Sequence, residues 1–266
     1  MFGRRPDATL VRDAAPVRRF MPFISPRRNE SLVYFAQEID VERALSFVAE
    51  KNRSRPAERP MTLFHLILRS IARRLDERPR LNRFTAGGKL WQREGIWLTF
   101  AAKKSFHDDA PIATVKCRFD GAETLDEMCD RLLDSIRVSR GDKKSTADHE
   151  VDLLLRLPAS IVHLVMRLVR VADGLGLLPR AMIDSDPMFT SVFVANLGSV
   201  GLEAAYHHLW DHGTCPIFCV VGRIHEIDGR RKITLKWSFD ERIEDGFYAA
   251  RSLDGLRELL ECPEKL

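Results

Sequence analysis

The sequence lacks an uninterrupted apolar run as long as a bilayer-spanning helix. Its first twenty residues, MFGRRPDATLVRDAAPVRRF, have charges throughout and no hydrophobic stretch of the kind found in a secretory signal. The most apolar segment, residues 151–179, is interrupted by Arg156, Pro158 and Arg167 well before the roughly 20 apolar residues that a span requires. We therefore expect a cytoplasmic protein without a transmembrane helix.

The sequence also lacks a strong excess of charge of one sign. Its 42 basic and 38 acidic residues leave a formal net charge of +4 on 266 residues. Such a balance creates no strong field for polyanions, so no nucleic-acid partner is expected. Hydrophobic residues make up 45% of the chain, and at this length they can bury one substantial core.

Cysteines are few and show no pairing typical of metal sites or disulfides. The five cysteines are an odd number without a CxxC pair, which favours reduced thiols in the cytoplasm. Cys215 and Cys219 can share a face of a strand, but ordinary packing explains them better than a metal. His107 with Asp108 and Asp109 is interpreted as a turn. No metal site is predicted.

The first 29 residues differ in composition from the rest. They combine seven arginines with four prolines, a mixture that resists regular helix or strand. We predict a basic, proline-rich N-terminal arm over residues 1–29, either solvated or docked on a neighbouring subunit or partner. Residues 30–266 are predicted to form the main domain.

Strand and helix patterns alternate along residues 30–266. Strand patterns cover residues 32–39, several segments between 81 and 120, and residues 189–198, 216–227 and 232–240. Helical patterns begin after Asp40 and Thr62, which suit N-cap positions, and at Thr124, and a last helix covers 247–261. No internal repeat is present. This order of elements predicts one α+β domain with a large mixed β-sheet backed by helices.

Residues 151–179, the most apolar segment, carry a helical pattern. His163, Arg167 and Arg170 lie at i, i+4 and i+7, which predicts a polar stripe on one face of a helix. Leu164, Val165, Leu168 and Val171 then lie on other faces. We interpret the segment as a helical lid or core layer. The alternative is a helix that contacts a membrane surface or an acyl chain.

The C-terminal string WSFDERIEDGFYAARSLDGLRELLECPEKL resembles the end of the catalytic cores of dihydrolipoyl acyltransferases from 2-oxo acid dehydrogenase complexes, and more distantly chloramphenicol acetyltransferase. In these families the string is Asp-His-Arg-x-x-Asp-Gly, followed by a helix that ends in Leu-Glu-x-Pro. The residues that match are Asp240, Arg242, Asp245, Gly246, Glu261 and Pro263. Glu241 stands at the position of the catalytic histidine.

Two further segments carry the same resemblance. FTSVFVANLGSVG with PIFCVVGRI is similar to the family's strand, Asn-Leu-Gly loop and following strand, and MTLFHLILRSIARRLDERPRLN is similar to its early helix. Together the three segments cover most of residues 30–266. Relative to the family, residues 141–188 are a helical insertion.

The resemblance implies a chloramphenicol acetyltransferase-like, two-layer sandwich that forms homotrimers. It implies CoA or acyl-CoA as a substrate that enters a channel at the subunit interface. The sequence shows no lipoyl attachment site and no lipoyl or subunit-binding domain before the core. A lipoylated or acyl-carrier partner is therefore expected to act in trans.

The resemblance also implies the roles of the site residues. The family's histidine takes a proton from the attacking thiol, and a serine or threonine before the Asn-Leu-Gly loop donates to the oxyanion. That donor position is Ala195 here. We expect Glu241 to polarise the acceptor and Asp245 to fix the local structure. Apart from the resemblance, two residues are candidates to replace the missing groups: Asn196 as an amide donor and His208 as an imidazole. The alternative for the adjacent histidines of this loop is local hydrogen bonding.

Two states of Glu241 are compatible with the sequence. If Asp240, Glu244 and Asp245 approach it, like-charge repulsion and burial would raise its pKa and make it a better base. Alternatively, Glu241 forms a salt bridge with Arg242 or another arginine.

These states correspond to two functions. The first is transfer of an acyl group between a CoA thioester and a thiol or other acceptor. The second is a catalytically degenerate trimeric scaffold or regulator, which the absence of both the histidine and the oxyanion donor favours.

Overall fold

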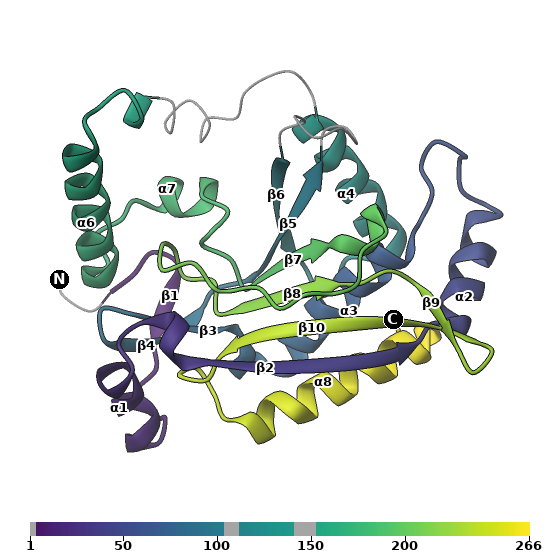
Figure 1. The fold of residues 1–266 in the computed structure, drawn as a ribbon, viewed down its shortest axis with the longest axis horizontal. Coiled ribbons are helices and arrows are strands. Elements are labelled where there is room, and N and C mark those ends of the chain that lie inside the picture. The colour runs from purple at the N-terminus through teal and green to yellow at the C-terminus, as the bar shows by residue number, and fades with distance from the viewer. Residues whose placement is uncertain (1–3, 104–111, 141–152) are drawn as a thin grey trace.

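The structure is a computed structural model that describes residues 4–103, 112–140 and 153–266. His107, Asp108 and Asp109, and the first part of 141–188, lie outside the described residues. At the centre of the molecule is a seven-stranded sheet with the order β2-β10-β8-β7-β5-β6, in which β9 pairs with β10 (Figure 1).

The central sheet is mixed, as predicted. Its strands are β2 (Leu32–Asp40), β5 (Ile96–Lys103), β6 (Ile112–Phe119), β7 (Val192–Asn196), β8 (Ile217–Val221), β9 (His225–Ile227) and β10 (Arg230–Asp240). The pairs β5–β7 and β7–β8 are parallel, and all the other pairs of this sheet are antiparallel.

Helices cover one face of the central sheet. They are α2 (Glu42–Asn52), α3 (Leu63–Glu77), α4 (Leu125–Arg140) and α8 (Gly246–Glu261). Alternate residues of β10, including Leu235, Trp237 and Phe239, belong to the buried core that these helices share with the sheet. This alternation is that of a strand with one face packed on a helical layer. The predicted two-layer α+β sandwich is confirmed.

A loop covers part of the opposite face of the central sheet. Residues 201–216, which have no regular structure, pack with Phe193 of β7 and Phe218 of β8 in a second apolar cluster. The two phenylalanine rings stack at 5.0 Å. His207 lies flat on Phe218 with 4.1 Å between the ring centroids.

The N-terminal segment is regular, so the prediction of an irregular arm was wrong. Residues Ala8–Leu10 form β1, which joins β4 (Lys89–Arg93) and β3 (Arg83–Ala86) in a small sheet in the order β1-β4-β3. Helix α1 (Pro16–Ile24) follows, and its first residue is a proline, which suits that position because it lacks an N–H. The segment is ordered despite its composition because β1 pairs with β4 and because Arg5 and Asp7 form a buried ion pair.

Two helices of the 141–188 segment are described, α6 (Ala159–Leu175) and α7 (Arg180–Ser185). No residue of α6 is buried, so the interpretation as a core layer was wrong. One side of α6 packs through Val169 and Ala172 on a small cluster that contains Ile183 and Phe189. Within the described part of the chain, none of the helices combines the length and the apolar character needed to cross a membrane.

Helix α3 begins after Thr62, as the sequence predicted. The Thr62 N–H donates to Nδ1 of His65 at 3.0 Å, so the histidine completes a capping box. His65 is buried, and its Nε2 has no hydrogen-bond partner among the described residues. Burial, with the nearby charge of Arg55, lowers the pKa of His65 to about 4.

His65 should therefore make stability depend on pH. Between about pH 4 and 6.5 the unfolded chain binds a proton at this residue and the folded chain does not, so stability falls as pH is lowered through this window. The full effect is about 3 kcal/mol. The variant His65→Gln keeps an acceptor for the cap. Its free energy of unfolding, measured with urea, should lose this part of the pH dependence. An unchanged slope would contradict the assignment.

Candidate functional site

The loop between β10 and α8 is built around a buried ion pair. Asp240 is 0% exposed and Arg242 is 3% exposed. Two guanidinium nitrogens of Arg242, Nε and Nη2, donate to the two carboxylate oxygens of Asp240 at 2.8 and 2.7 Å. This bidentate arrangement is the strongest form of an arginine–carboxylate contact. It accounts for the Asp-x-Arg spacing of the C-terminal string.

The N-terminal segment supplies a second arginine to Asp240. Nε of Arg28 lies 3.9 Å from Asp240 Oδ2, and Arg28 is itself buried. The other donors of Arg28 reach the loop that covers the sheet, with Nη1 donating to the carbonyl of Trp210 and Nη2 to that of Gly213 at 2.9 Å. Arg28 therefore joins the N-terminal segment, β10 and the 201–216 loop.

The backbone of Glu241 is held by the same N-terminal segment. Its N–H donates to the carbonyl of Ser31 at 2.9 Å, and its carbonyl accepts from Nη1 of Arg18. Arg242 Nη1 also donates to the carbonyls of Ser25 and Pro26 at 3.1 and 3.0 Å. Helix α1 and the chain that follows it thus fix the position of the Glu241 main chain.

The Glu241 side chain has a different environment from its acidic neighbours. It is half-buried. Glu244 is buried and pairs with Arg83 at 3.1 Å and, more weakly, with Arg80 at 3.6 Å. Among the residues that the structure describes, the Glu241 carboxylate has neither an ion pair nor a hydrogen bond.

The alternative in which Glu241 forms a salt bridge with Arg242 is therefore wrong. Arg242 is occupied by Asp240, because those two side chains lie on the buried side of the loop and form two parallel hydrogen bonds. The acidic neighbours Asp240 and Glu244 each have an arginine partner. The arginines compensate the negative charges of both residues.

Asp245 is exposed and is the N-cap of α8. Its Oδ1 accepts the N–H of Tyr248 at 2.8 Å, which satisfies one of the free donors in the first helical turn. The aspartate of the string therefore sets the start of the last helix. This is a local structural contact within the β10–α8 loop.

Asn196 ends β7 and caps the turn that follows. Its Oδ1 accepts the N–H of Ser199 at 3.1 Å. The amide NH₂ group of Asn196 takes no part in this hydrogen bond. Gly198 in the same turn lies so close to the next strand that a Cβ there would be 2.4 Å from the carbonyl oxygen of Gly222. The backbones of the Asn-Leu-Gly and Gly-Arg segments are therefore in close contact.

One chain does not bring Asn196 and Glu241 together. Asn196 pairs with Val221, and Val221 pairs with Leu235 of β10. Asn196 is thus level with Leu235, and Glu241 follows Leu235 by six residues. At the usual rise of a strand, Asn196 and Glu241 therefore lie roughly 20 Å apart along the strand direction. Ala195, the expected donor position, lies next to Asn196 at the same far end.

His208 is exposed and lies in the 201–216 loop. Its ring stacks on that of His207 at 4.5 Å. Burial lowers the pKa of His207, whose carbonyl accepts from the hydroxyl of Ser238 on β10. Of the two histidines, His207 is the one packed into the structure.

Sequence reasoning missed Arg18 and Arg28 as parts of this site. Both belong to residues 1–29, whose seven arginines and four prolines predict an irregular arm, either solvated or docked on a neighbouring subunit or partner. The sequence did contain a signal that could have indicated these arginines. The DERIED string carries four carboxylates and one arginine within six residues, so it needs cations from elsewhere in the chain if it is buried.

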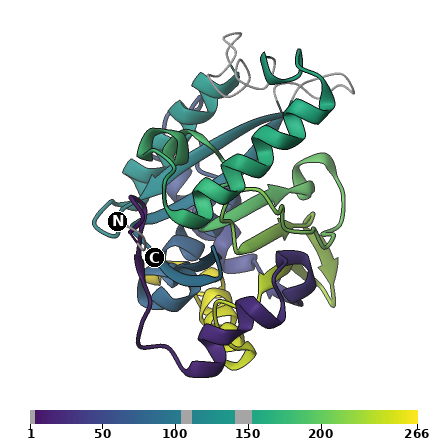
Figure 2. The same ribbon diagram turned by 90° about the vertical axis from the view of Figure 1, so that its left-hand side faces the viewer.

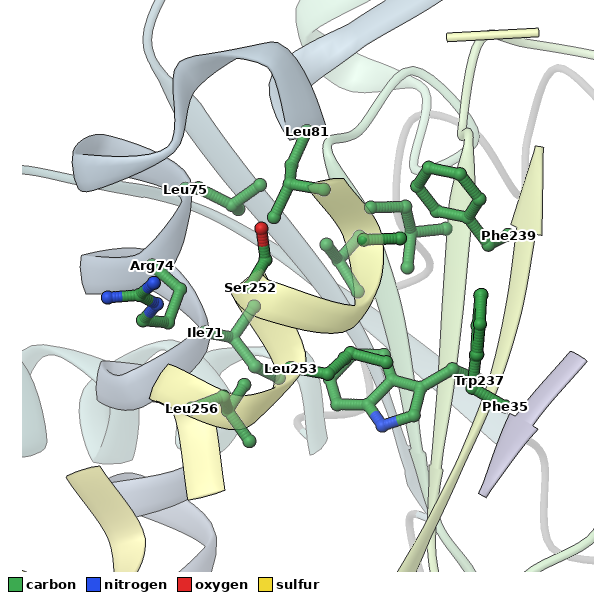
Figure 3. A pocket seen from close by; sticks show the side chains of 13 residues that line it. Phe35, Ile71, Arg74, Leu75, Leu81, Trp237, Phe239, Ser252, Leu253 and Leu256 are labelled. Atoms are coloured by element: carbon green, nitrogen blue, oxygen red, sulfur yellow. The ribbon is translucent and has the colours of Figure 1, made fainter. Parts of the chain in front are cut away.

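An apolar pocket lies on the helical side of the central sheet (Figure 3). It is enclosed by α3, α8 and the strands, and Trp237 and Arg74 lie at opposite ends of its lining. The Trp237 Nε1–H has no partner among the described residues. The volume is about 40 Å³, which is room for water or a very small group but not for an acyl chain unless side chains move.

No protein-family model matches the chain, and no curated protein matches it in sequence. Solved structures do match. A truncated catalytic core of the 2-oxoacid dehydrogenase multienzyme complex from Thermoplasma acidophilum has a TM-score of 0.62 at 16% identity, with 95% of this chain and 98% of that chain covered. A chloramphenicol acetyltransferase has a TM-score of 0.61 at 11% identity, with 95% and 99% covered.

The chain has the chloramphenicol acetyltransferase-like fold. Dihydrolipoamide acetyltransferase of Azotobacter vinelandii shares it, with a TM-score of 0.58 at 18% identity over 94% of this chain and 92% of that chain. The fold is thus one that acyltransferases use, and the fold expected from the resemblance is confirmed.

Asp240 should be critical for stability. In Asp240→Asn, Arg28 and Arg242 remain buried without a compensating charge, and we expect a loss of about 3 kcal/mol or more in the free energy of unfolding. The control is Asp254→Asn, which removes an exposed pair with Arg257 on α8 and should cost under about 1 kcal/mol. Urea titration of both variants measures this, and equal small losses would contradict the prediction.

Proposed function

We propose that the protein transfers an acyl group between a CoA thioester and a thiol or other acceptor, with Glu241 as the group that accepts the proton. The fold supports acyl transfer in general. The observation that carries the proposal is the half-buried Glu241 carboxylate, which has no partner among the described residues. By the resemblance of the C-terminal string, Glu241 corresponds to the histidine of the acyltransferases.

The chemistry requires a base at the acceptor and a donor where negative charge develops. A carboxylate is a weaker base than an imidazole, so we expect slower turnover than with histidine. The backbone contacts of Glu241 with Ser31 and Arg18 hold its Cα in place, and the side chain is left to meet the acceptor. Asp245 supports this by fixing the start of α8.

The donor half of the site would come from a second copy of the chain. Asn196 lies too far from Glu241 along the sheet to act with it in one chain. A cyclic homotrimer with a heterologous interface can place the Asn196 end of one copy against the Glu241 end of the next. Light scattering should then give three times the chain mass of 30.4 kDa, and a monomer would contradict this arrangement.

Glu241→Gln tests the proposed base. The amide keeps the size of the side chain but cannot accept the proton, so CoA release from acyl-CoAs in the presence of thiol or amine acceptors should fall at least about tenfold. Binding of CoA, measured by calorimetry, should change little. The matched control is Glu258→Gln on α8, which should leave both quantities unchanged.

Turnover that is equal in Glu241→Gln and in the unaltered protein would remove Glu241 from the mechanism. Failure of the unaltered protein to bind CoA or any acyl-CoA would contradict the acyl-transfer proposal itself.

A second candidate function is a trimeric scaffold or regulator without catalysis. Alanine at position 195 and the exposed position of His208 favour it, because neither residue gives the Glu241 loop an additional catalytic group. The same assay separates the two functions. Absence of turnover at high protein concentration, with a trimer and a stoichiometric partner recovered, would favour the scaffold.

A further inference from the structure

Helices α1 and α6 lie at the same end of the molecule (Figures 1 and 2). They are more than 130 residues apart in the sequence. A pocket of about 210 Å³ lies between them and is lined by Pro22 of α1, by Arg170 and Asp173 of α6, and by the β3–β4 turn. The two helices therefore border one continuous surface.

Helix α6 exposes an unbroken apolar row. Its exposed apolar residues are Ile161, Leu164, Leu168, Val171 and Leu175. Their spacing of three and four places them on one face of the helix. Leu164 and Leu168 are 55% and 58% exposed. The side of α6 that packs on Ile183 and Phe189 is a different one, so the exposed row is free in the described chain.

Helix α1 repeats the pattern. Val17, Phe20, Phe23 and Ile24 are exposed, with Phe23 at 65%, while Pro22 is buried against the body of the protein. Two helices from distant parts of the sequence thus present bulky apolar side chains to the outside at the same end of the fold.

Arginines accompany both apolar rows. Residues 12–27 contain Arg12, Arg18, Arg19 and Arg27, and their single carboxylate is Asp13. Residues 153–172 contain Arg156, Arg167 and Arg170 and no carboxylate. Asp173, at the end of α6, is already paired with the buried Arg5 at 2.7 Å. The chain is nearly balanced in charge as a whole, so these two segments are more positive than the rest.

We propose that α1 and α6 form a docking surface for an anionic lipid bilayer. Helices with leucine or phenylalanine on one face and arginine beside it lie in the headgroup region of such bilayers with their apolar face inserted. Anionic headgroups complement the excess of arginine, and Arg27 and Arg170 at the pocket can donate to a lipid phosphate. A protein partner would need an acidic group at a fixed position opposite each arginine. In a lipid bilayer the anionic headgroups can move to meet the arginines.

Sedimentation with vesicles tests this inference. The unaltered full chain is mixed with vesicles of phosphatidylcholine alone, or of phosphatidylcholine and phosphatidylglycerol in equal parts. We expect binding to the mixed vesicles that weakens as salt is added, and little binding to the neutral ones. The double variant Leu164→Ser with Leu168→Ser should bind at least about tenfold more weakly, because two inserting side chains are lost.

Two matched controls separate this surface from general effects. Val138→Ser removes a side chain that is 79% exposed on α4, and it should bind as the unaltered chain does. Arg167→Glu should weaken binding, whereas Arg53→Glu, the same charge reversal at an exposed position after α2, should have a much smaller effect.

The inference is overturned if the unaltered chain does not sediment with anionic vesicles, or if the double variant binds them equally well. It is also overturned if the double variant lowers the mass of the assembly in solution while no vesicle binding is found, because α1 and α6 would then be a contact between copies. These outcomes do not depend on acyl transfer, since vesicle binding is read without a substrate.

Discussion

The buried carboxylate of Asp240 is the interaction on which the arrangement of the β10–α8 loop depends. It accepts two hydrogen bonds from the guanidinium of Arg242 and one from its backbone N–H, and it lies near Arg28. One group therefore ties together the end of β10, the segment after α1 and the loop over the sheet. A buried charge of this kind is stable only while its partners remain. The position of the Glu241 main chain follows from the same contacts, because the residues on either side of it are fixed.

This constraint divides the acidic string into structural and available carboxylates. Asp240 and Glu244 are paired with arginines, and Asp245 caps α8. Glu241 alone within the string makes no such contact in the described part of the chain. A site that uses Glu241 would also need donors, and Asn196 stands at the other end of the sheet. The proposed function therefore depends on assembly as much as on the loop itself.

Much of the fold could be predicted from the sequence, because alternation in β10 and helical spacing in α3 are local patterns that the core reinforces. The N-terminal segment could not, since burial of Arg5 and Arg28 depends on Asp7 and Asp240, and such pairing is a tertiary event. The sequence indicated which residues belong to the candidate site, but it did not indicate which of their side chains form ion pairs with each other. A pair between Arg242 and Glu241 was one alternative compatible with the sequence, yet Arg242 pairs with Asp240. The separation of Asn196 from Glu241 became evident only from strand register.

The most direct test is complementation between two variants that should each have impaired activity, Glu241→Gln and Asn196→Ala, produced in the same cell with different affinity tags. If each site combines Glu241 of one copy with Asn196 of the next, mixed trimers contain some sites with both residues intact, about a quarter of the total at equal mixing. Acyl-transfer activity should then return to roughly that fraction of the unaltered level. Mixed assemblies no more active than the two variants alone would contradict a site shared between chains.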